Sequence, residues 1–160
     1  KIINKRNYKG EQKGDIKIKS RKNFKSIICP TSLNSSAIDE FMLIFLVACK
    51  SQGISTFKNL NELNKKESPR LNIAIKFMKM IGIKVIRKKN DIKIFGNPNL
   101  KLKKKYHMKK FLKDHRIFMM SVIAALTLGG NGWMVEDKDS IKTSFPNFLN
   151  ILKILGAKIN

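Results

Sequence analysis

The sequence is poor in cysteine, and the cysteines that it has do not form a recognisable site. Cys29 and Cys49 are the two cysteines among 160 residues. They lack the short spacing of metal ligands, and no further cysteines build a disulfide framework around them. We therefore expect no metal site and a reducing, cytoplasmic environment, and a secreted protein loses support.

Long apolar runs are missing as well. The two most apolar stretches, residues 41–49 and 117–128, are shorter than the roughly 20 residues that a helix needs to cross a bilayer. We also expect no signal peptide before them. The sequence therefore predicts buried helices and no membrane partner.

Acidic residues are scarce. The chain has 11 Asp and Glu against 34 Lys and Arg, a formal net charge of +23, which usually points to nucleic acid or an anionic membrane. Most of this charge is lysine, accompanied by abundant isoleucine and asparagine, as an AT-biased coding sequence would give. The arginines are Arg6, Arg21, Arg70, Arg87 and Arg116. We interpret most of the charge as solvated surface, with a secondary field that favours anionic ligands.

The lysine-rich segment 101–106 is the contact strip that a nucleic-acid-binding module would use. It lacks a recognition motif and interleaved aromatic side chains, so we expect a solvated linker and no nucleic-acid partner. A basic nucleic-acid-binding module is nevertheless the alternative from a different class of function.

The 42% hydrophobic content is enough for a core, either as one domain or as part of a larger one. The chain begins with lysine in the middle of a pattern, and we expect a fragment of a longer protein. Residues 1–14 are polar and lysine-rich, and residues 97–110 are an expected basic linker. The expected strands cover residues 15–20, 24–29, 54–60, 83–87, 91–95 and 133–136, and the expected helices cover residues 36–51, 69–81, 115–128 and 146–155.

Two helix starts carry charged residues. Ser68 followed by Pro69 predicts an N-cap and a first turn, so that free N–H groups and the helix dipole favour a bound anion. Arg70 adds a planar fork and Lys66 a compact ammonium, whereas Glu67 is either a counter-ion or a proton-transfer group. Similarly, Ser36 to Asp39 fits a capping box for the first helix, which Gly53 would end.

The two halves of the chain match each other. Residues 78–85 align with residues 152–159 at an offset of 74, and Asp39 aligns with Asp114 at an offset of 75. Each half is a packing unit, because neither copy alone can cover its apolar helices. We therefore predict that equivalent helix starts converge at one end of the domain. The side chains brought together would be Asp39, Lys66, Glu67, Arg70, His115 and Arg116.

Four motifs follow one another in a characteristic order between Asp39 and Ala157. They are Asp39-Glu40 before an apolar helix, Glu62-Leu63 followed by Lys66-Glu67-Ser68-Pro69-Arg70, then Asp114-His115-Arg116, and finally Thr143-Ser144-Phe145-Pro146-Asn147-Phe148 followed by Leu155-Gly156-Ala157. In these motifs the sequence resembles the 5-enolpyruvylshikimate-3-phosphate synthase family, also called 3-phosphoshikimate 1-carboxyvinyltransferases.

The resemblance implies an inside-out α/β barrel of repeated βαβαββ units, in two domains with the active site between them. This chain, residues 1–160, would be the C-terminal part of one domain, with units at about 15–97 and 98–160. The implied reaction transfers the enolpyruvyl group of phosphoenolpyruvate to the 5-hydroxyl of 3-phosphoshikimate and releases phosphate. The family implies no cofactor and, for the full-length protein, a cytoplasmic monomer of the shikimate pathway.

The resemblance also implies roles for single residues. Asp39 would accept a proton and contact 3-phosphoshikimate, Lys66 would hold the same substrate, and Glu67 would transfer a proton at the enolpyruvyl carbon. Phosphoenolpyruvate would be bound by Arg70 and Arg116, and His115 would assist. The competing interpretations are a capping carboxylate for Asp39, a solvated lysine for Lys66 and a structural histidine for His115.

The sequence departs from the family at two positions: Pro69 replaces the usual aspartate, and Asn64 a frequent arginine. Pro69 removes a carboxylate that would orient Arg70. Lys142 lies one position away from the lysine that some members place before the Phe-Pro pair, and we keep it as a further candidate. A UDP-N-acetylglucosamine enolpyruvyl transferase is the alternative enzyme, against which the Lys66–Arg70 and Ser144-Phe145-Pro146 motifs argue.

Overall fold

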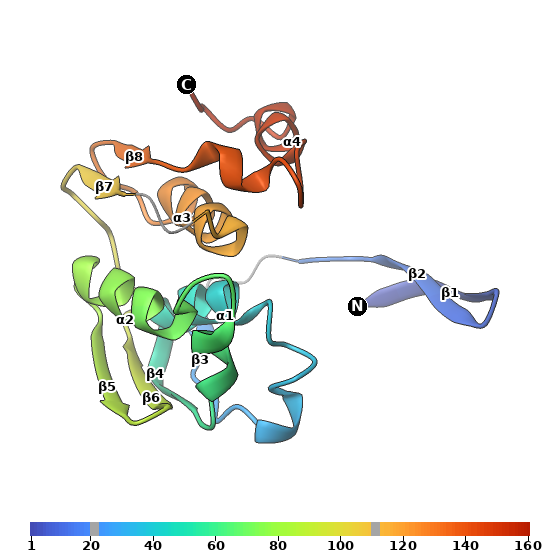
Figure 1. Ribbon diagram of the computed structural model, residues 1–160, viewed down its shortest axis with the longest axis horizontal. Coiled ribbons are helices and arrows are strands. Elements are labelled where there is room, and N and C mark those ends of the chain that lie inside the picture. Colours follow the sequence, from blue (N-terminus) through green and yellow to red (C-terminus); the bar gives the residue numbers. More distant parts are fainter. Residues whose placement is uncertain (20–22, 110–112) are drawn as a thin grey trace.

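The computed structural model describes residues 1–19, 23–109 and 113–160, and the chain is mixed α/β (Figure 1). The strands are β1 Ile2–Tyr8, β2 Glu11–Ile16, β3 Phe24–Lys25, β4 Ser51–Phe57, β5 Lys84–Lys88, β6 Asp91–Gly96, β7 Tyr106–Met108 and β8 Trp133–Val135. The α-helices are α1 Phe41–Cys49, α2 Arg70–Met80, α3 His115–Thr127 and α4 Phe148–Ile154, and the 3-10 helices are η1 Thr31–Leu33, η2 Asn61–Lys65 and η3 Lys138–Ile141. None of the helices in these ranges is both long and apolar enough to pass through a membrane.

The first two strands form an antiparallel hairpin that stands away from the rest of the chain (Figure 1). Its turn is made by Lys9 and Gly10, at φ of 49° and 84°, the left-handed geometry that a tight hairpin turn needs. The expected strand over residues 15–20 is therefore wrong in its bounds, and β1 was missed. Because nearly all residues of the hairpin are exposed, no alternation of buried side chains marks it in the sequence.

The main sheet has the order β3-β4-β6-β5. The β3–β4 pair is parallel, while β4–β6 and β5–β6 are antiparallel. The strand pair expected over residues 83–95 is confirmed, with Lys88 opposite Asp91 at its turn. Helices α1 and α2 lie between this sheet and α3 (Figure 1), and the first helix packs its aromatic side chains against β4. The centroids of the Phe45 and Phe57 rings are 5.0 Å apart.

The first helix begins later than the sequence predicts. Residues 34–40 form turns, and α1 starts at Phe41 after Glu40, whose side chain makes no capping hydrogen bond. The capping box is therefore wrong: the Ser36 hydroxyl donates to the carbonyl of Leu33 instead, at 3.1 Å. The helix ends at Cys49, so that Gly53 is not its stop signal but lies within β4 at φ 101°.

The second half repeats the order of the first: strand, helix, parallel strand, 3-10 helix, helix. Helix α3, strand β8 and helix α4 lie within two residues of the predicted ends. The expected linker over residues 97–110 is wrong in part, because it contains β7, and Leu102 forms a bridge to Gly129.

The two halves also end their last helix in the same way. Gly82 after α2 and Gly156 after α4 have φ of 82° and 93°, in the left-handed region. In both copies the N–H of this glycine and the N–H of the next residue donate to carbonyls of the last turn. Gly82 donates to Lys79 and Ile83 to Met78, and in the second copy Gly156 donates to Lys153 and Ala157 to Leu152. The aligned glycines are thus equivalent helix stops.

Candidate active site

The beginnings of α2 and α3 meet the turn that precedes α1. Ion pairs and hydrogen bonds join side chains that are far apart in the sequence, as with Arg116 and Glu40 or Arg70 and Asp114. We call this group the charged cluster; its members are Asp39, Glu40, Lys66, Glu67, Arg70, Asp114, His115 and Arg116. All six side chains predicted to converge at one end belong to it.

Arg70 and Asp114 form the buried centre of the charged cluster. Their side chains are 2% and 0% exposed, and Arg70 Nε donates to Asp114 Oδ2 at 2.9 Å. Burial alone would raise the pKa of Asp114, but the hydrogen bonds from Arg70 and Ser68 and the charge of Arg70 outweigh it and lower that pKa. Burial opposes the charge on Arg70 too, yet its carboxylate partners raise its pKa. Both groups are therefore charged.

Asp114 connects the two helix starts. One carboxylate oxygen caps α3 by accepting the N–H groups of Arg116 at 3.0 Å and Ile117 at 3.3 Å. The other accepts from Arg70 and from the Ser68 hydroxyl, at 2.6 Å. Ser68 is therefore not the N-cap that the sequence predicts. Pro69 occupies that position, and the Ser68 hydroxyl donates to Asp114 instead. No role was predicted for Asp114 itself, although aspartate directly before an apolar helix is a helix-capping signal.

Asp39 lies between three cations. Its Oδ1 is 3.0 Å from Arg70 Nη1 and 4.0 Å from Lys66 Nζ, and its Oδ2 is 3.7 Å from Arg116 Nη2. The side chain is 44% exposed. Asp39 is thus a shared counter-ion that keeps a solvent-facing carboxylate, and the expectation that it caps the first helix is wrong.

Glu67 and His115 form a pair beside this centre. His115 Nδ1 is 3.0 Å from Glu67 Oε2, and the same oxygen is 3.7 Å from Arg70 Nη2. Glu67, Asp114 and His115 each bring one possible metal-ligand atom within 4.8 Å of the others. Because Asp114 is already fully bonded and Arg70 lies between the carboxylates, this group suits proton exchange between Glu67 and His115 better than a cation.

Arg116 faces the acidic residues before α1. Its Nη1 is 3.1 Å from Glu40 Oε1, and its Nη2 is 3.7 Å from Asp39 Oδ2. Its Nε is buried without a hydrogen-bond partner in the described part of the chain. The first turn of α3 therefore holds a guanidinium whose two terminal nitrogens face carboxylates, while its buried Nε has no partner among the described residues.

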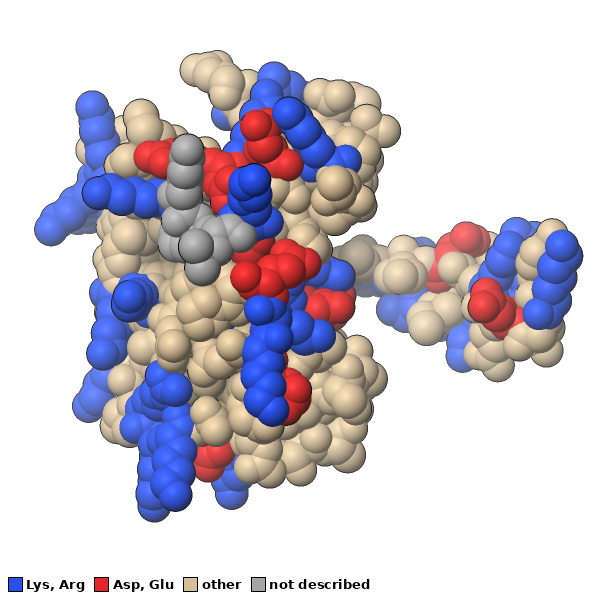
Figure 2. Space-filling view, viewed as in Figure 1, with Lys and Arg blue, Asp and Glu red and all other residues tan. Residues whose placement is uncertain are grey.

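The charged cluster is locally less basic than the chain. It holds three fixed cations and four carboxylates, a formal charge of −1 with neutral His115, against +23 for the whole sequence. Figure 2 accordingly shows acidic side chains gathered in the middle of one face, with basic ones around them. Such a site combines anion-binding donors with carboxylates that can exchange protons.

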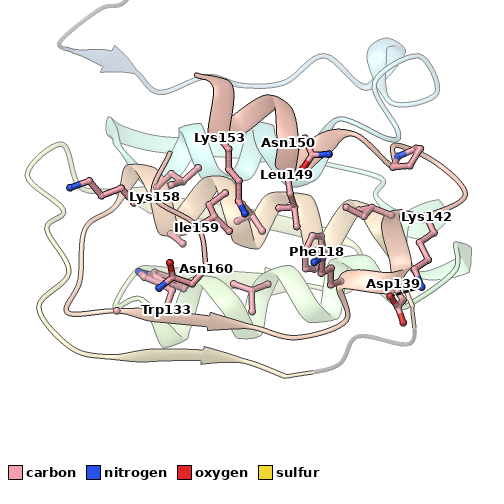
Figure 3. Close-up of a pocket in the computed structure, with 18 of the residues that line it drawn as sticks. Phe118, Trp133, Asp139, Lys142, Leu149, Asn150, Lys153, Lys158, Ile159 and Asn160 are labelled. Carbon is pink, nitrogen blue, oxygen red and sulfur yellow. Dashed lines mark ion pairs between the residues drawn. The ribbon is translucent and has the colours of Figure 1, made fainter. Parts of the chain in front are cut away.

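Lys142 lies elsewhere. It follows η3 and lines a cavity of about 720 Å³ between α3, β8, α4 and the end of the chain (Figure 3). Apolar side chains such as Phe118 and Leu149 form part of this cavity, and no member of the charged cluster lines it. Lys142 Nζ pairs with Asp139 at 2.9 Å, and the pair lowers the pKa of that carboxyl.

Comparison with known proteins places this geometry in a family. The 3-phosphoshikimate 1-carboxyvinyltransferase of Zymomonas mobilis is 35% identical over 158 residues, which are 98% of this chain and 34% of that protein. The enzyme of the same name from Ruthia magnifica is 35% identical over 163 residues, 99% of this chain and 35% of the relative. The chain thus spans about a third of the length of the curated relatives that it matches.

A solved structure agrees. The EPSP synthase of Acinetobacter baumannii superposes with a TM-score of 0.83 and 27% identity, over 100% of this chain and 36% of that one. The expected inside-out α/β fold class is confirmed, although the sheets within the described residues are open rather than closed into a barrel. Residues 7–152 match the family described as EPSP synthase (3-phosphoshikimate 1-carboxyvinyltransferase), and the chain belongs to that family.

Proposed function

We propose that this chain supplies part of the active site of an enzyme that transfers the enolpyruvyl group of phosphoenolpyruvate to the 5-hydroxyl of 3-phosphoshikimate and releases phosphate. The observation that carries the proposal is the meeting of the Lys66–Arg70 and Asp114–Arg116 segments on Asp39. Two anionic substrates need cationic donors, and the addition needs a base and an acid within the same site.

The arginines bind phosphoenolpyruvate in this proposal. Arg116 supports the role best, because it is 29% exposed and its two carboxylate partners, Asp39 and Glu40, are 44% and 54% exposed. Arg70 is 2% exposed and holds three carboxylates, Asp114, Asp39 and Glu67. Arg70 can bind a substrate when Asp39 or Glu67 releases its guanidinium, while the ion pair with Asp114 keeps the side chain in place. Pro69 replaces the aspartate that would orient Arg70 in the family. In this chain the buried carboxylate of Asp114 orients Arg70 instead.

Proton transfer falls to the carboxylates. Asp39, half-exposed beside three cations, accepts the proton of the attacking 5-hydroxyl, and Lys66 holds the same substrate. Glu67, whose Oε2 lies 3.0 Å from His115 Nδ1, exchanges a proton with the methylene carbon of the enolpyruvyl group. Lys142 pairs with Asp139 outside the charged cluster, and its role in the site stays a prediction. We further propose a monomeric, cytoplasmic full-length protein that needs no cofactor.

Kinetics of the complete protein that contains these residues test the proposal. Arg116→Ala should raise KM for phosphoenolpyruvate about ten- to a hundredfold, the value of one or two charge-assisted hydrogen bonds. Asp39→Asn should lower kcat about a hundredfold or more, because it removes the base and keeps the shape. Arg87→Ala is the matched control, since Arg87 binds Asn72 at 2.6 Å outside the charged cluster. Unchanged KM in the first variant or unchanged kcat in the second would remove that assignment.

A further inference from the structure

The contact between Glu40 and Arg116 joins the beginnings of α1 and α3, which are far apart in the sequence. Glu40 is the last residue before α1, and Arg116 lies in the first turn of α3. Glu40 Oε1 is 3.1 Å from Arg116 Nη1, and the side chains are 54% and 29% exposed. The pair therefore sits at the solvent-facing edge of the charged cluster.

The fold does not depend on this contact. The Glu40 side chain makes no capping hydrogen bond to α1, and α1 is held by its buried residues Phe41, Met42 and Phe45. A partly exposed ion pair between long side chains contributes little to stability. Arg116 is anchored by its own helix, whose cap is Asp114 and not Glu40. Glu40 can consequently leave Arg116 without loss of structure.

The contact does compete with anion binding. A guanidinium takes a phosphate or carboxylate best with two parallel N–H donors. In Arg116 one terminal nitrogen faces Glu40, the other is 3.7 Å from Asp39, and the buried Nε has no partner in the ranges that the structure describes. An incoming anion would need the terminal N–H donor that Glu40 holds, and it would meet the negative charge of that carboxylate.

We propose that Glu40 is an affinity-determining residue that acts as an internal competitor for Arg116. Its carboxylate occupies the guanidinium in the empty site and is displaced when a phosphate-bearing substrate binds. This inference rests on the proposed function only in taking Arg116 as an anion-binding residue. It assigns to Glu40 an effect on binding, not on the chemical step.

Titration of the chain with inorganic phosphate tests this inference. Removal of the competing charge in Glu40→Gln should lower the Kd for phosphate about threefold to tenfold. The Arg116 Nε–H resonance should report the binding directly. Glu62→Gln is the matched control, because it makes the same change of charge at an exposed glutamate that pairs with Lys65 outside the charged cluster, at 3.0 Å. The gain should vanish when Arg116→Ala is combined with Glu40→Gln.

The outcomes separate cleanly. A tighter phosphate complex in Glu40→Gln, absent in Glu62→Gln and dependent on Arg116, supports the inference. The inference is overturned if the wild type and Glu40→Gln bind phosphate equally well, or if neither binds it. It is also overturned if Glu40→Gln and Glu62→Gln gain the same phosphate affinity. Neither result uses enolpyruvyl transfer, so failure of the proposed function is recognised independently, by its kinetics. In the complete protein the same substitution should lower KM for phosphoenolpyruvate and leave kcat unchanged within about twofold.

Discussion

At the scale of single residues, Asp114 connects more of the site than any other carboxylate in the charged cluster. It caps α3, accepts the Ser68 hydroxyl and pairs with buried Arg70. A buried ion pair is costly to break from one side, because the remaining charge loses its partner in a place that water cannot reach. The consequences of altering Asp114 are therefore predictable in direction and size.

Asp114→Asn should lower the free energy of unfolding by about 3 kcal/mol, measured by urea denaturation of the whole chain. The amide keeps the cap but leaves Arg70 with only the half-exposed carboxylates Asp39 and Glu67. Asp139→Asn is the control, because it breaks an ion pair to Lys142 between exposed side chains. It should leave the unfolding midpoint almost unchanged. Equal midpoints in the two variants would show that the buried pair does not stabilise the chain.

The same residue predicts an acid dependence. The folded state lowers the pKa of Asp114 below its usual value of 3.8, so the unfolded chain takes up this proton first as the pH falls. The stability from Asp114 is thus complete above about pH 5 and lost as the pH falls towards the lowered pKa. Between pH 5 and pH 3, the free energy of unfolding of the wild type should fall more steeply than that of Asp114→Asn. The difference should reach at most about 1.4 kcal/mol per pH unit. Parallel curves would contradict this assignment.

The sequence predicted all three fixed cations of the charged cluster but only two of its four carboxylates, missing Glu40 and Asp114, and it did not predict how the side chains are bonded. Motif order and the repeat brought Asp39, Arg70 and Arg116 together correctly. The pairing of Arg70 with Asp114, 44 positions away, depends on how α2 and α3 pack, and no local pattern encodes it. For the same reason Ser68 was predicted to cap the helix. A serine before a helix often accepts a backbone N–H of the first turn, and this preference can be read from the local sequence. The buried carboxylate of Asp114, which accepts the Ser68 hydroxyl instead, lies 46 positions away.

At the scale of elements, the paired helix stops Gly82 and Gly156 should respond alike to substitution. Both have positive φ, and nothing lies within 4 Å of an added Cβ, so alanine costs only backbone strain. Gly82→Ala and Gly156→Ala should each lower the free energy of unfolding by about 1 kcal/mol, measured in urea.

Gly96→Ala is the contrasting variant. There an added Cβ would overlap the carbonyl oxygens of Ala48 and Ser51, and the loss should be larger, about 2–3 kcal/mol. If Gly82→Ala and Gly156→Ala differed strongly from each other, the equivalence of the two helix ends would not hold energetically.

Elements with a strong local signal were predicted well. Helices α2 and α3 and the β5–β6 hairpin carry clear periodicity and end signals, whereas β1 and β7 carry neither. The hairpin β1–β2 is almost wholly exposed, and β7 is three residues long and becomes a strand only by pairing with β8, 27 positions away. Such strands are defined by their partners, which lie outside the window that a sequence pattern covers.

At the scale of the whole molecule, the sign of the net charge differs from the sign of the charge at the candidate site. The chain carries +23, yet the charged cluster has more carboxylates than fixed cations. The lysines outside it supply a diffuse field, which attracts anionic substrates from a distance and weakens with salt. We therefore expect selection among anions to depend on the few arginines and their carboxylates, whereas net charge alone would have favoured the nucleic-acid alternative.

The chain on its own should not catalyse the proposed reaction. It spans about a third of the length of its curated relatives, and the proposed reaction must hold two phosphorylated substrates at once. The charged cluster offers only Lys66, Arg70 and Arg116 as fixed cations, and all three already face carboxylates. We therefore expect no phosphate release from phosphoenolpyruvate and 3-phosphoshikimate by these 160 residues, while the complete protein that contains them turns over.

A coupled assay of released phosphate measures this, with the same mixture without protein as the reference. Circular dichroism of the chain must show that it is folded during the assay, so that a lack of turnover reports missing substrate contacts rather than unfolding. Turnover by the chain above that reference would show that the charged cluster alone binds and activates both substrates. The cleft expected between two domains would then not be needed for catalysis.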